Sequence, residues 1–82
     1  NPFNNETTVS FSLKETMNTR LSVSTLQGQE ISILTDMVLP KGDHEIKWDG
    51  TDAAGNRVPS GIYMLKFATE KGVDFRKIVI SR

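Results

Sequence analysis

The stretch that decides the fold covers residues 61–82 and reads GIYMLKFATEKGVDFRKIVISR. Apolar residues recur at every second position of its first half, and this period of two is typical of a β-strand. The apolar residues of that half are Tyr63, Leu65 and Phe67. Glu70-Lys71-Gly72 then interrupts the pattern, and a second apolar run follows it up to Ser81. Two such runs joined by a short turn that contains glycine predict a β-hairpin.

The second run of this hairpin carries apolar side chains on both of its faces. Ile78 and Ile80 point one way, and Phe75 and Val79 point the other way. A strand with apolar residues on both faces is usually covered by other parts of the protein on both faces. We therefore expect the last strand to be shielded from solvent on both faces.

The rest of the chain shows the same alternation and few helical signals. Further runs with a period of two cover residues 8–13, 21–24, 31–33 and 44–48. Turn signals with glycine separate them at residues 27–28 and 40–43. This spacing predicts an all-β sandwich or barrel of six strands, with a seventh near residues 1–5 or 36–39. Faces rich in Ser and Thr favour an antiparallel sandwich with one wet side per sheet.

The composition limits the size of the protein and its partners. A chain of 82 residues with 37% hydrophobic content forms one small domain, residues 1–82, around a thin core. Lys and Arg number 10, as do Asp and Glu, and nucleic-acid binding would need a basic excess. Since there is no cysteine, disulfides and thiolate zinc sites are excluded. The opening at Asn1 leads us to expect a piece of a longer protein.

The single histidine, His44, is the first candidate for chemistry. As a general base or a metal ligand it would need a nucleophile, an acid or further ligands, and the sequence suggests none nearby. Its phase with Ile46 and Trp48 favours a histidine near a strand end, with one polar edge towards water.

The polar connection after that strand contains Asp49, Asp52 and Asn56. Oxygen-rich loops bind calcium, but the spacing departs from the calcium-loop pattern and lacks its closing Glu. The stronger interpretation is that these side chains accept hydrogen bonds from loop amides and shape the turn. A carboxylate pair would also suit glycoside hydrolysis, but so small a domain leaves little room for a sugar-binding cleft.

Trp48 is the only tryptophan, and it is either a stacking platform for a sugar or the main anchor of the core. Its phase with Ile46 favours the core. Asn5-Glu6-Thr7 matches the N-glycosylation pattern, which arises often by chance. We predict no catalytic residue, no metal site, no cofactor and no small-molecule substrate.

The C-terminal run from Arg76 to Arg82 is basic at both ends and apolar in the middle. One interpretation makes it a final core strand whose charges discourage edge pairing. The other makes it a strand that a partner grips through backbone hydrogen bonds and side-chain pockets. Both interpretations stay open from these residues alone.

Several short motifs, taken together and in order, make the chain resemble a known family. They are Asn1-Pro2-Phe3-Asn4, His44-Glu45-Ile46-Lys47-Trp48-Asp49-Gly50, Asp52-Ala53-Ala54-Gly55, Pro59-Ser60-Gly61-Ile62-Tyr63 and Arg76-Lys77-Ile78-Val79-Ile80. In this order they resemble the C-terminal sorting domains (type A) of the type IX secretion system. Residues 48–63 are also similar to the Ig-like domain of flagellar hook-capping proteins. The resemblance implies an Ig-like antiparallel sandwich of about seven strands.

For the sorting domains the resemblance also implies a function. Such a domain directs a larger cargo protein, fused upstream, through the outer-membrane translocon, and a sortase-like peptidase commonly removes it. The translocon, the peptidase and the cargo would be its partners. The protein would leave a gram-negative cell through the periplasm and reach the cell surface or the exterior. The domain would act by presenting its C-terminal hairpin, not by catalysing a reaction.

The motif positions carry over to this chain residue by residue. Those expected to hold the fold are Asn1, Pro2, Phe3, Trp48, Asp49, Gly50, Gly55, Gly61 and Tyr63. Those expected to meet the translocon are Gly72, Arg76, Lys77, Ile78, Val79 and Ile80. One departure is that relatives often have a proline soon after the opening motif, where this chain has Asn5.

Sorting is therefore the leading hypothesis. The alternative is an Ig-like structural module, either in a flagellar hook-cap protein or as a spacer beside an extracellular enzyme. A third hypothesis is a free-standing carbohydrate- or calcium-binding module, which only Trp48 and the loop from Asp49 to Asn56 support.

Overall fold

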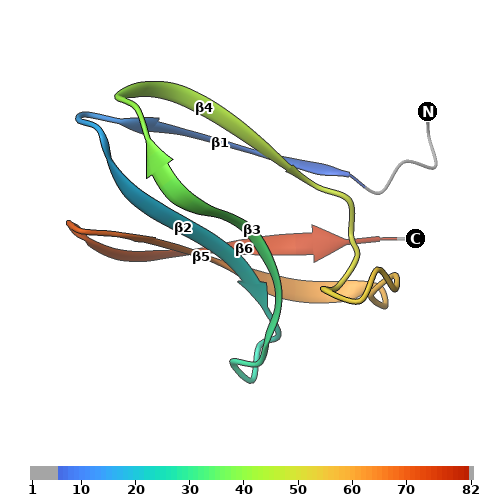
Figure 1. The fold of residues 1–82 in the computed structure, drawn as a ribbon. Helices are drawn as coiled ribbons and strands as arrows, with labels where there is room; N and C mark the ends of the chain where they lie inside the picture. Colours follow the sequence, from blue (N-terminus) through green and yellow to red (C-terminus); the bar gives the residue numbers. More distant parts are fainter. Residues whose placement is uncertain (1–5, 82) are drawn as a thin grey trace.

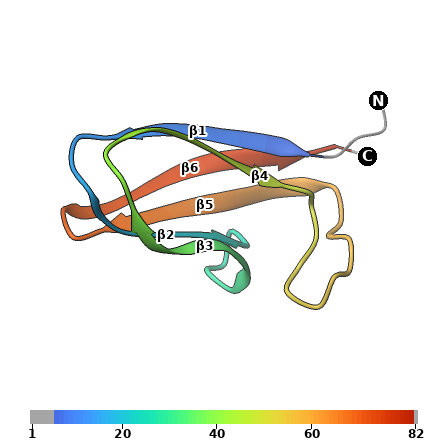
Figure 2. The same ribbon diagram turned by 45° about the horizontal axis from the view of Figure 1, so that its top comes forward.

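The alternating runs form six antiparallel strands in the computed structural model, which describes residues 6–81 (Figure 1). The strands are β1 (Thr7–Leu13), β2 (Met17–Ser24), β3 (Glu30–Leu39), β4 (Gly42–Trp48), β5 (Gly61–Thr69) and β6 (Gly72–Ile80). β1 and β4 form one sheet, and the other has the order β3-β2-β5-β6. The two sheets face each other as the layers of a sandwich (Figures 1 and 2). The described residues include no helix whose length and hydropathy would let it cross a membrane.

The hairpin predicted over residues 61–82 is confirmed as β5 and β6. Its register runs from Gly61 opposite Ile80 to Thr69 opposite Gly72. β5 also pairs with β2, which places it inside the larger sheet and leaves β6 at the edge. Consequently the two strands of the hairpin differ in surroundings, although both show the alternation typical of strands.

The core lies between the sheets and is made by the inward-facing half of each alternating run. Its buried apolar residues are Val9, Phe11, Leu13, Met17, Leu21, Val23, Trp48, Val58, Tyr63, Leu65, Ile78 and Ile80. Thr19 is also fully buried, and its hydroxyl donates to the carbonyl of Met17 at 3.2 Å. Each buried polar side-chain atom among the described residues has a hydrogen-bond partner. Within residues 6–81, the core therefore carries no unpaired polar side chain that would oppose folding.

The expected seventh strand is not separate from the others within residues 6–81. Residues 36–39 belong to β3, which continues to Leu39 past two irregularities in its pairing with β2. Residues 1–5, the other place proposed for it, lie outside the described residues. A β-bulge inserts an extra residue without ending a strand, so the change of phase within residues 30–39 does not mark a new element.

The smaller sheet has two strands and the larger has four, so part of the larger sheet stays open. On β3, Met37 pairs with the buried Thr19 and so lies on the inner face, yet it is 55% exposed. At the other edge the guanidinium of Arg76 in β6 donates to the carbonyl of Ser10 in β1 at 3.1 Å. This contact joins the two layers where their free edges meet.

Candidate interaction surfaces

The loop between β4 and β5 projects from one end of the sandwich (Figure 2) and contains the carboxylates considered for calcium. Asp49 Oδ1 accepts hydrogen bonds from the Thr51 amide at 3.2 Å and hydroxyl at 2.6 Å. The Thr51 hydroxyl is the main reason why the pKa of Asp49 lies below its ordinary value of 3.8. Asp52 Oδ1 accepts from the amides of Ala54 and Asn56, both at 3.0 Å. Both carboxylates thus shape the loop, as the turn interpretation predicts.

Trp48 and Tyr63 anchor this loop to the core. Trp48 is only 2% exposed, and its Nε1 donates to the carbonyl of Thr51 at 2.9 Å. The Trp48 and Tyr63 rings pack edge to face, with centroids 5.8 Å apart. Tyr63 Oη donates to the carbonyl of Pro59 at 2.6 Å, a bond to upstream backbone like that of the tyrosine corner in Ig-type sandwiches. Burial of Trp48 contradicts the sugar-platform interpretation and confirms the core one.

His44 is held by its neighbours in the manner expected of a histidine near a strand end. Its Nε2 donates to the carbonyl of Pro40 at 2.7 Å. Its ring stacks on Phe11, with centroids 5.4 Å apart and planes 25° apart. The polar edge is therefore occupied by backbone and the face by an aromatic ring.

The remaining motif residues fall into three places. Gly50 and Gly55 lie in the loop with positive φ of 79° and 88°, where glycine is favoured. Gly61 is the first residue of β5. Asn1, Pro2 and Phe3 lie outside the described residues.

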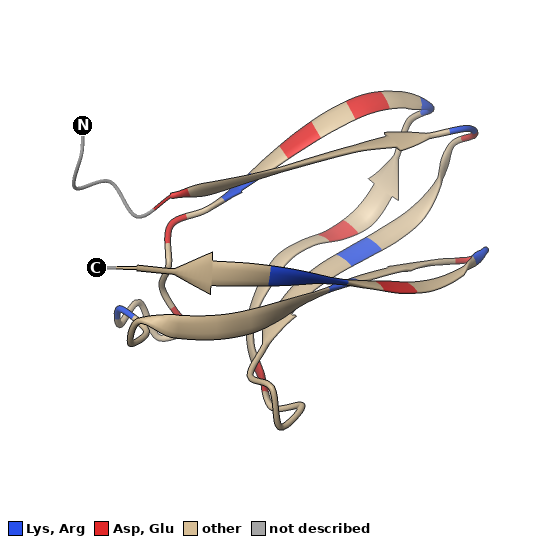
Figure 3. Ribbon diagram, turned by 180° about the vertical axis from the view of Figure 1, so that it is seen from behind, with Lys and Arg blue, Asp and Glu red and all other residues tan. Residues whose placement is uncertain are grey.

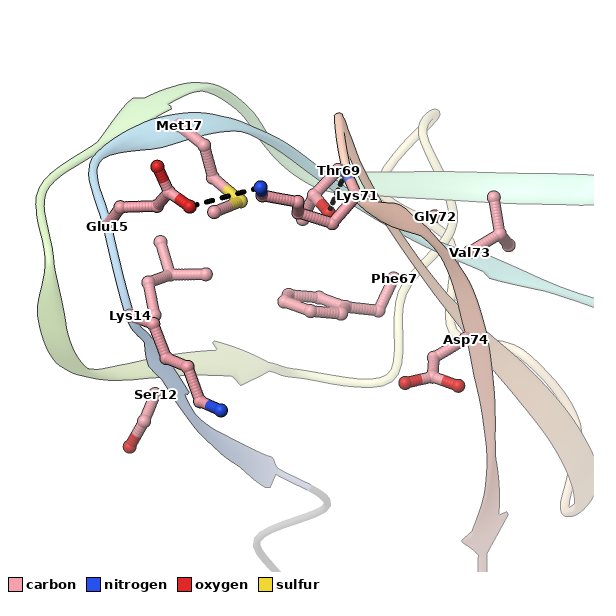
Figure 4. A pocket seen from close by; sticks show the side chains of 11 residues that line it. Ser12, Lys14, Glu15, Met17, Phe67, Thr69, Lys71, Gly72, Val73 and Asp74 are labelled. Atoms are coloured by element: carbon pink, nitrogen blue, oxygen red, sulfur yellow. Dashed lines mark hydrogen bonds and ion pairs between the residues drawn. The ribbon is translucent and has the colours of Figure 1, made fainter.

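A groove of about 640 Å³ opens between the β1–β2 turn and the β5–β6 turn (Figure 4). Leu13, Met17 and Phe67 supply apolar side chains to it. Lys71 and Glu15 form an ion pair at 3.2 Å across one side, as the dashed line in Figure 4 marks. The groove unites residues far apart in the sequence, so no local pattern could have revealed it. The groove is lined by two basic residues, Lys14 and Lys71, and two acidic residues, Glu15 and Asp74. Because these charges balance, the groove has no preference for a positively or a negatively charged ligand.

β6 distributes the residues predicted for partner recognition between two faces and a turn. Ile78 and Ile80 are 6% and 3% exposed and belong to the core. Lys77 and Val79 point to solvent, and Val79 is 60% exposed. Arg76 reaches β1 as described above. Gly72 begins the strand with φ of 143°, a value that glycine adopts more readily than other residues.

The expectation that β6 is shielded on both faces is wrong. Phe75 is 58% exposed and Val79 is 60% exposed. The reason lies in the layering, because the β1–β4 sheet covers only the inner face of the larger sheet (Figure 1). The exposed side chains and their neighbours on β5 form one surface, here called the apolar–lysine face. It consists of Ile62, Lys66, Val73, Phe75, Lys77 and Val79.

Comparison with known proteins identifies relatives of this fold. The family model described as "FlgD Ig-like domain" matches residues 2–72. FlgD from Pseudomonas aeruginosa matches with a TM-score of 0.70 and 20% identity, over 92% of this chain and 59% of that chain. Truncated FlgD from Helicobacter pylori matches with a TM-score of 0.62 and 20% identity, over 94% of this chain and 60% of that chain. No curated protein sequence matches. This chain therefore spans about three fifths of the solved structures that it resembles.

These matches confirm the predicted Ig-like sandwich and correct the predicted function. The assignment to type IX sorting domains is wrong, because the matching family model and both solved structures are of FlgD. Most of the motif residues that suggested sorting lie within residues 2–72, which the FlgD family model matches. The family match ends at residue 72, and the basic-apolar end that favoured sorting lies beyond it.

Proposed function

The chain belongs to the FlgD Ig-like domain family, and from this premise we propose that it is the Ig-like module of a flagellar hook-capping protein. The observation that carries the proposal is the family match over residues 2–72. The superposition on FlgD from Pseudomonas aeruginosa over 92% of the chain supports the same fold for nearly all of the domain.

In this proposal the domain works as a rigid module that binds other proteins and catalyses nothing. The side chains that raised the question of catalysis have structural partners instead. His44 bonds to the backbone of Pro40, and Asp49 and Asp52 bond to their own loop. A sandwich with a fully paired core suits a component that must keep its shape within an assembly.

We further propose that the domain is part of a longer protein and that its partners are proteins, not nucleic acid or small molecules. The solved FlgD chains are longer than this one, which supports a fused neighbouring domain. Membership in this family is compatible with export from a gram-negative cell.

Deletion of the segment that encodes residues 1–82, within the full-length gene of the parent organism, tests this function. We expect cells without the segment to fail in building hooks of normal form, as seen by electron microscopy, and to lose motility. The intact gene supplied on a plasmid should restore both. Normal hooks in the deletion strain would refute the hook-cap proposal. In that case the neighbouring sequence would show whether the module is a spacer beside an enzyme.

A further inference from the structure

We propose that the apolar–lysine face of β5 and β6 is a docking surface for an acidic, amphipathic protein partner. Such a partner presents apolar side chains flanked by Asp or Glu. This inference goes beyond the hook-cap proposal, since it rests on the surface of the hairpin and would hold equally for a spacer module. The residues of β6 that carry it, from Val73 onward, follow the segment that the family model matches.

The pairing register makes this surface continuous. Ile62 lies opposite Val79, Lys66 opposite Phe75, and Val73 opposite Ala68. Residues directly opposite each other in an antiparallel pair share a face and approach within about 5.5 Å. The alternate positions, such as Leu65 and Ile78, are buried in the core. The pleat of the hairpin therefore directs all members of the face outward together.

The apolar members are too exposed and too close together for an ordinary solvated sheet face. Ile62 is 44%, Val73 is 53% and Phe75 is 58% exposed. Single exposed apolar residues are common, whereas a contiguous patch on a soluble domain marks an interaction site. The neighbouring strand β2 shows the usual alternative, because it presents Arg20 and Ser22 on this side of the sheet. The outer side of β3 also exposes Ile33 and Val38, but Asp36 lies on the same side and is paired with Arg20.

The lysines of the apolar–lysine face indicate that the partner is acidic. Neither Lys66 nor Lys77 has an ion-pair partner among residues 6–81, whereas Arg20 is paired with both Glu30 and Asp36. The outward positions of β5 and β6 include no carboxylate, since Met64 lies opposite Lys77 and Ala68 opposite Val73. Figure 3 shows the blue segments of this hairpin, with red only towards its turn. Carboxylates on the partner would supply the missing complementary charge.

The same charges argue against a second copy of the chain as the occupant. Two such faces stacked on each other would bring lysines together with no carboxylate between them. Like charges placed across an interface disfavour that association strongly. The outer face of the other sheet is also unsuitable, because its outward positions, such as Thr8, Ser10, Glu45 and Lys47, are polar. An acidic, amphipathic protein surface fits both properties of the face at once.

Site-specific photo-crosslinking in the full-length protein, produced in its parent cells, tests the proposal. Benzoylphenylalanine replaces Phe75, and in a second protein it replaces Val79 in case the first folds poorly. Both positions are exposed, so thermal unfolding should match that of the unmodified protein. We expect crosslinks to a protein segment with apolar residues and at least two Asp or Glu. The same probe at Thr8, on the outer face of the other sheet, should not capture that segment.

Charge reversal then separates docking from chance proximity. Lys66→Glu combined with Lys77→Glu should lower the crosslinking yield by about tenfold or more, and the neutral Gln pair serves if the Glu pair is unstable. Lys47→Glu, on the β4 outer face, is the matched control and should leave the yield unchanged. Replacing the partner's Asp and Glu residues by Lys should restore the crosslinking yield of the variant that carries Glu at positions 66 and 77.

The proposal would be overturned by crosslinks only to lipid, to a second copy of the chain, or to a neutral or basic segment. The absence of any crosslink would also overturn it. A crosslinking yield that stays the same after charge reversal would overturn it as well. Hook assembly is measured separately, so failure of either proposal leaves the other testable.

Discussion

A single carboxylate, that of Asp49, ties the end of β4 to the loop that follows. It accepts two hydrogen bonds from Thr51, and the hydroxyl bond in particular favours the charged form. The same loop is held from inside by Trp48 and by the Tyr63 hydroxyl. At the scale of residues, therefore, the loop owes its shape to bonds made by its own polar groups.

The lowered pKa of Asp49 gives a pH dependence whose sign can be stated. Because the folded pKa lies below the unfolded value of 3.8, the charged form stabilises the fold above that value. This contribution is lost as the pH falls through the folded pKa. We expect Asp49→Asn to lower the free energy of unfolding at neutral pH, and the difference from wild type to narrow below pH 3.8.

Urea unfolding at a series of pH values measures this difference. Glu45→Gln, at an exposed strand position, checks that the loss of one negative charge elsewhere does not reproduce the narrowing. A gap between Asp49→Asn and wild type that stays constant from neutral to acidic pH would contradict the argument.

At the scale of elements, the β2–β3 connection shows how a short turn depends on one glycine. The Gly28 amide donates to the carbonyl of Thr25 at 3.0 Å, and Thr25 and Gln29 are also bonded. Gly28 has φ of 96°, a conformation that side chains with a Cβ disfavour. A Cβ at this position would meet nothing within 4 Å. The penalty of a substitution thus comes from the backbone alone.

We expect Gly28→Ala to destabilise the domain by about 1 kcal/mol. Chemical unfolding of the purified chain measures the change. Gln27→Ala, an exposed position in the same turn, should stay within about 0.5 kcal/mol of wild type. Equal effects of the two substitutions would show that the turn tolerates a side chain at residue 28.

At the scale of the whole molecule, stability depends on a thin core between unequal sheets. A domain of this size has a stability of about 5 kcal/mol, and no second layer of packing supports it. Leu65 lies in the middle of this core and is 1% exposed, whereas Leu26 lies in the β2–β3 turn and is 59% exposed. The two leucines share their chemistry and differ only in burial.

Leu65→Ala should therefore reduce the free energy of unfolding by about 2–5 kcal/mol, from lost apolar burial and the cavity left behind. Leu26→Ala should change it by less than about 0.5 kcal/mol. Urea denaturation followed by circular dichroism compares the two. If they proved equally destabilising, the arrangement of the sheets around Leu65 would be in doubt.

Local patterns sufficed for the elements and much of the core. The period of two located part of each strand, although it covered only residues 21–24 of β2 and 31–33 of β3. Glycine and proline located the turns other than the one at residues 14–16, and the phase of Trp48 with Ile46 placed the tryptophan in the core. The hydrogen-bonding role of Asp49 and Asp52 was also readable, because it involves residues only a few positions away. The family was harder to assign, since residues 48–63 resemble two similar groups of domains.

What the sequence by itself determined was thus the all-β class and the inward half of the strands other than β3, because these depend on alternation along the chain. In β3 two irregularities in the pairing interrupt the alternation, and Ile33 is exposed. Only the tertiary structure decided which outward faces stay open. β6 is apolar on both sides, yet its outer side faces solvent because the second sheet covers the larger sheet from one side only. The groove beside Phe67 and the bond from Arg76 to Ser10 likewise join segments distant in sequence. Such features depend on sheet order and layering, which no local periodicity encodes.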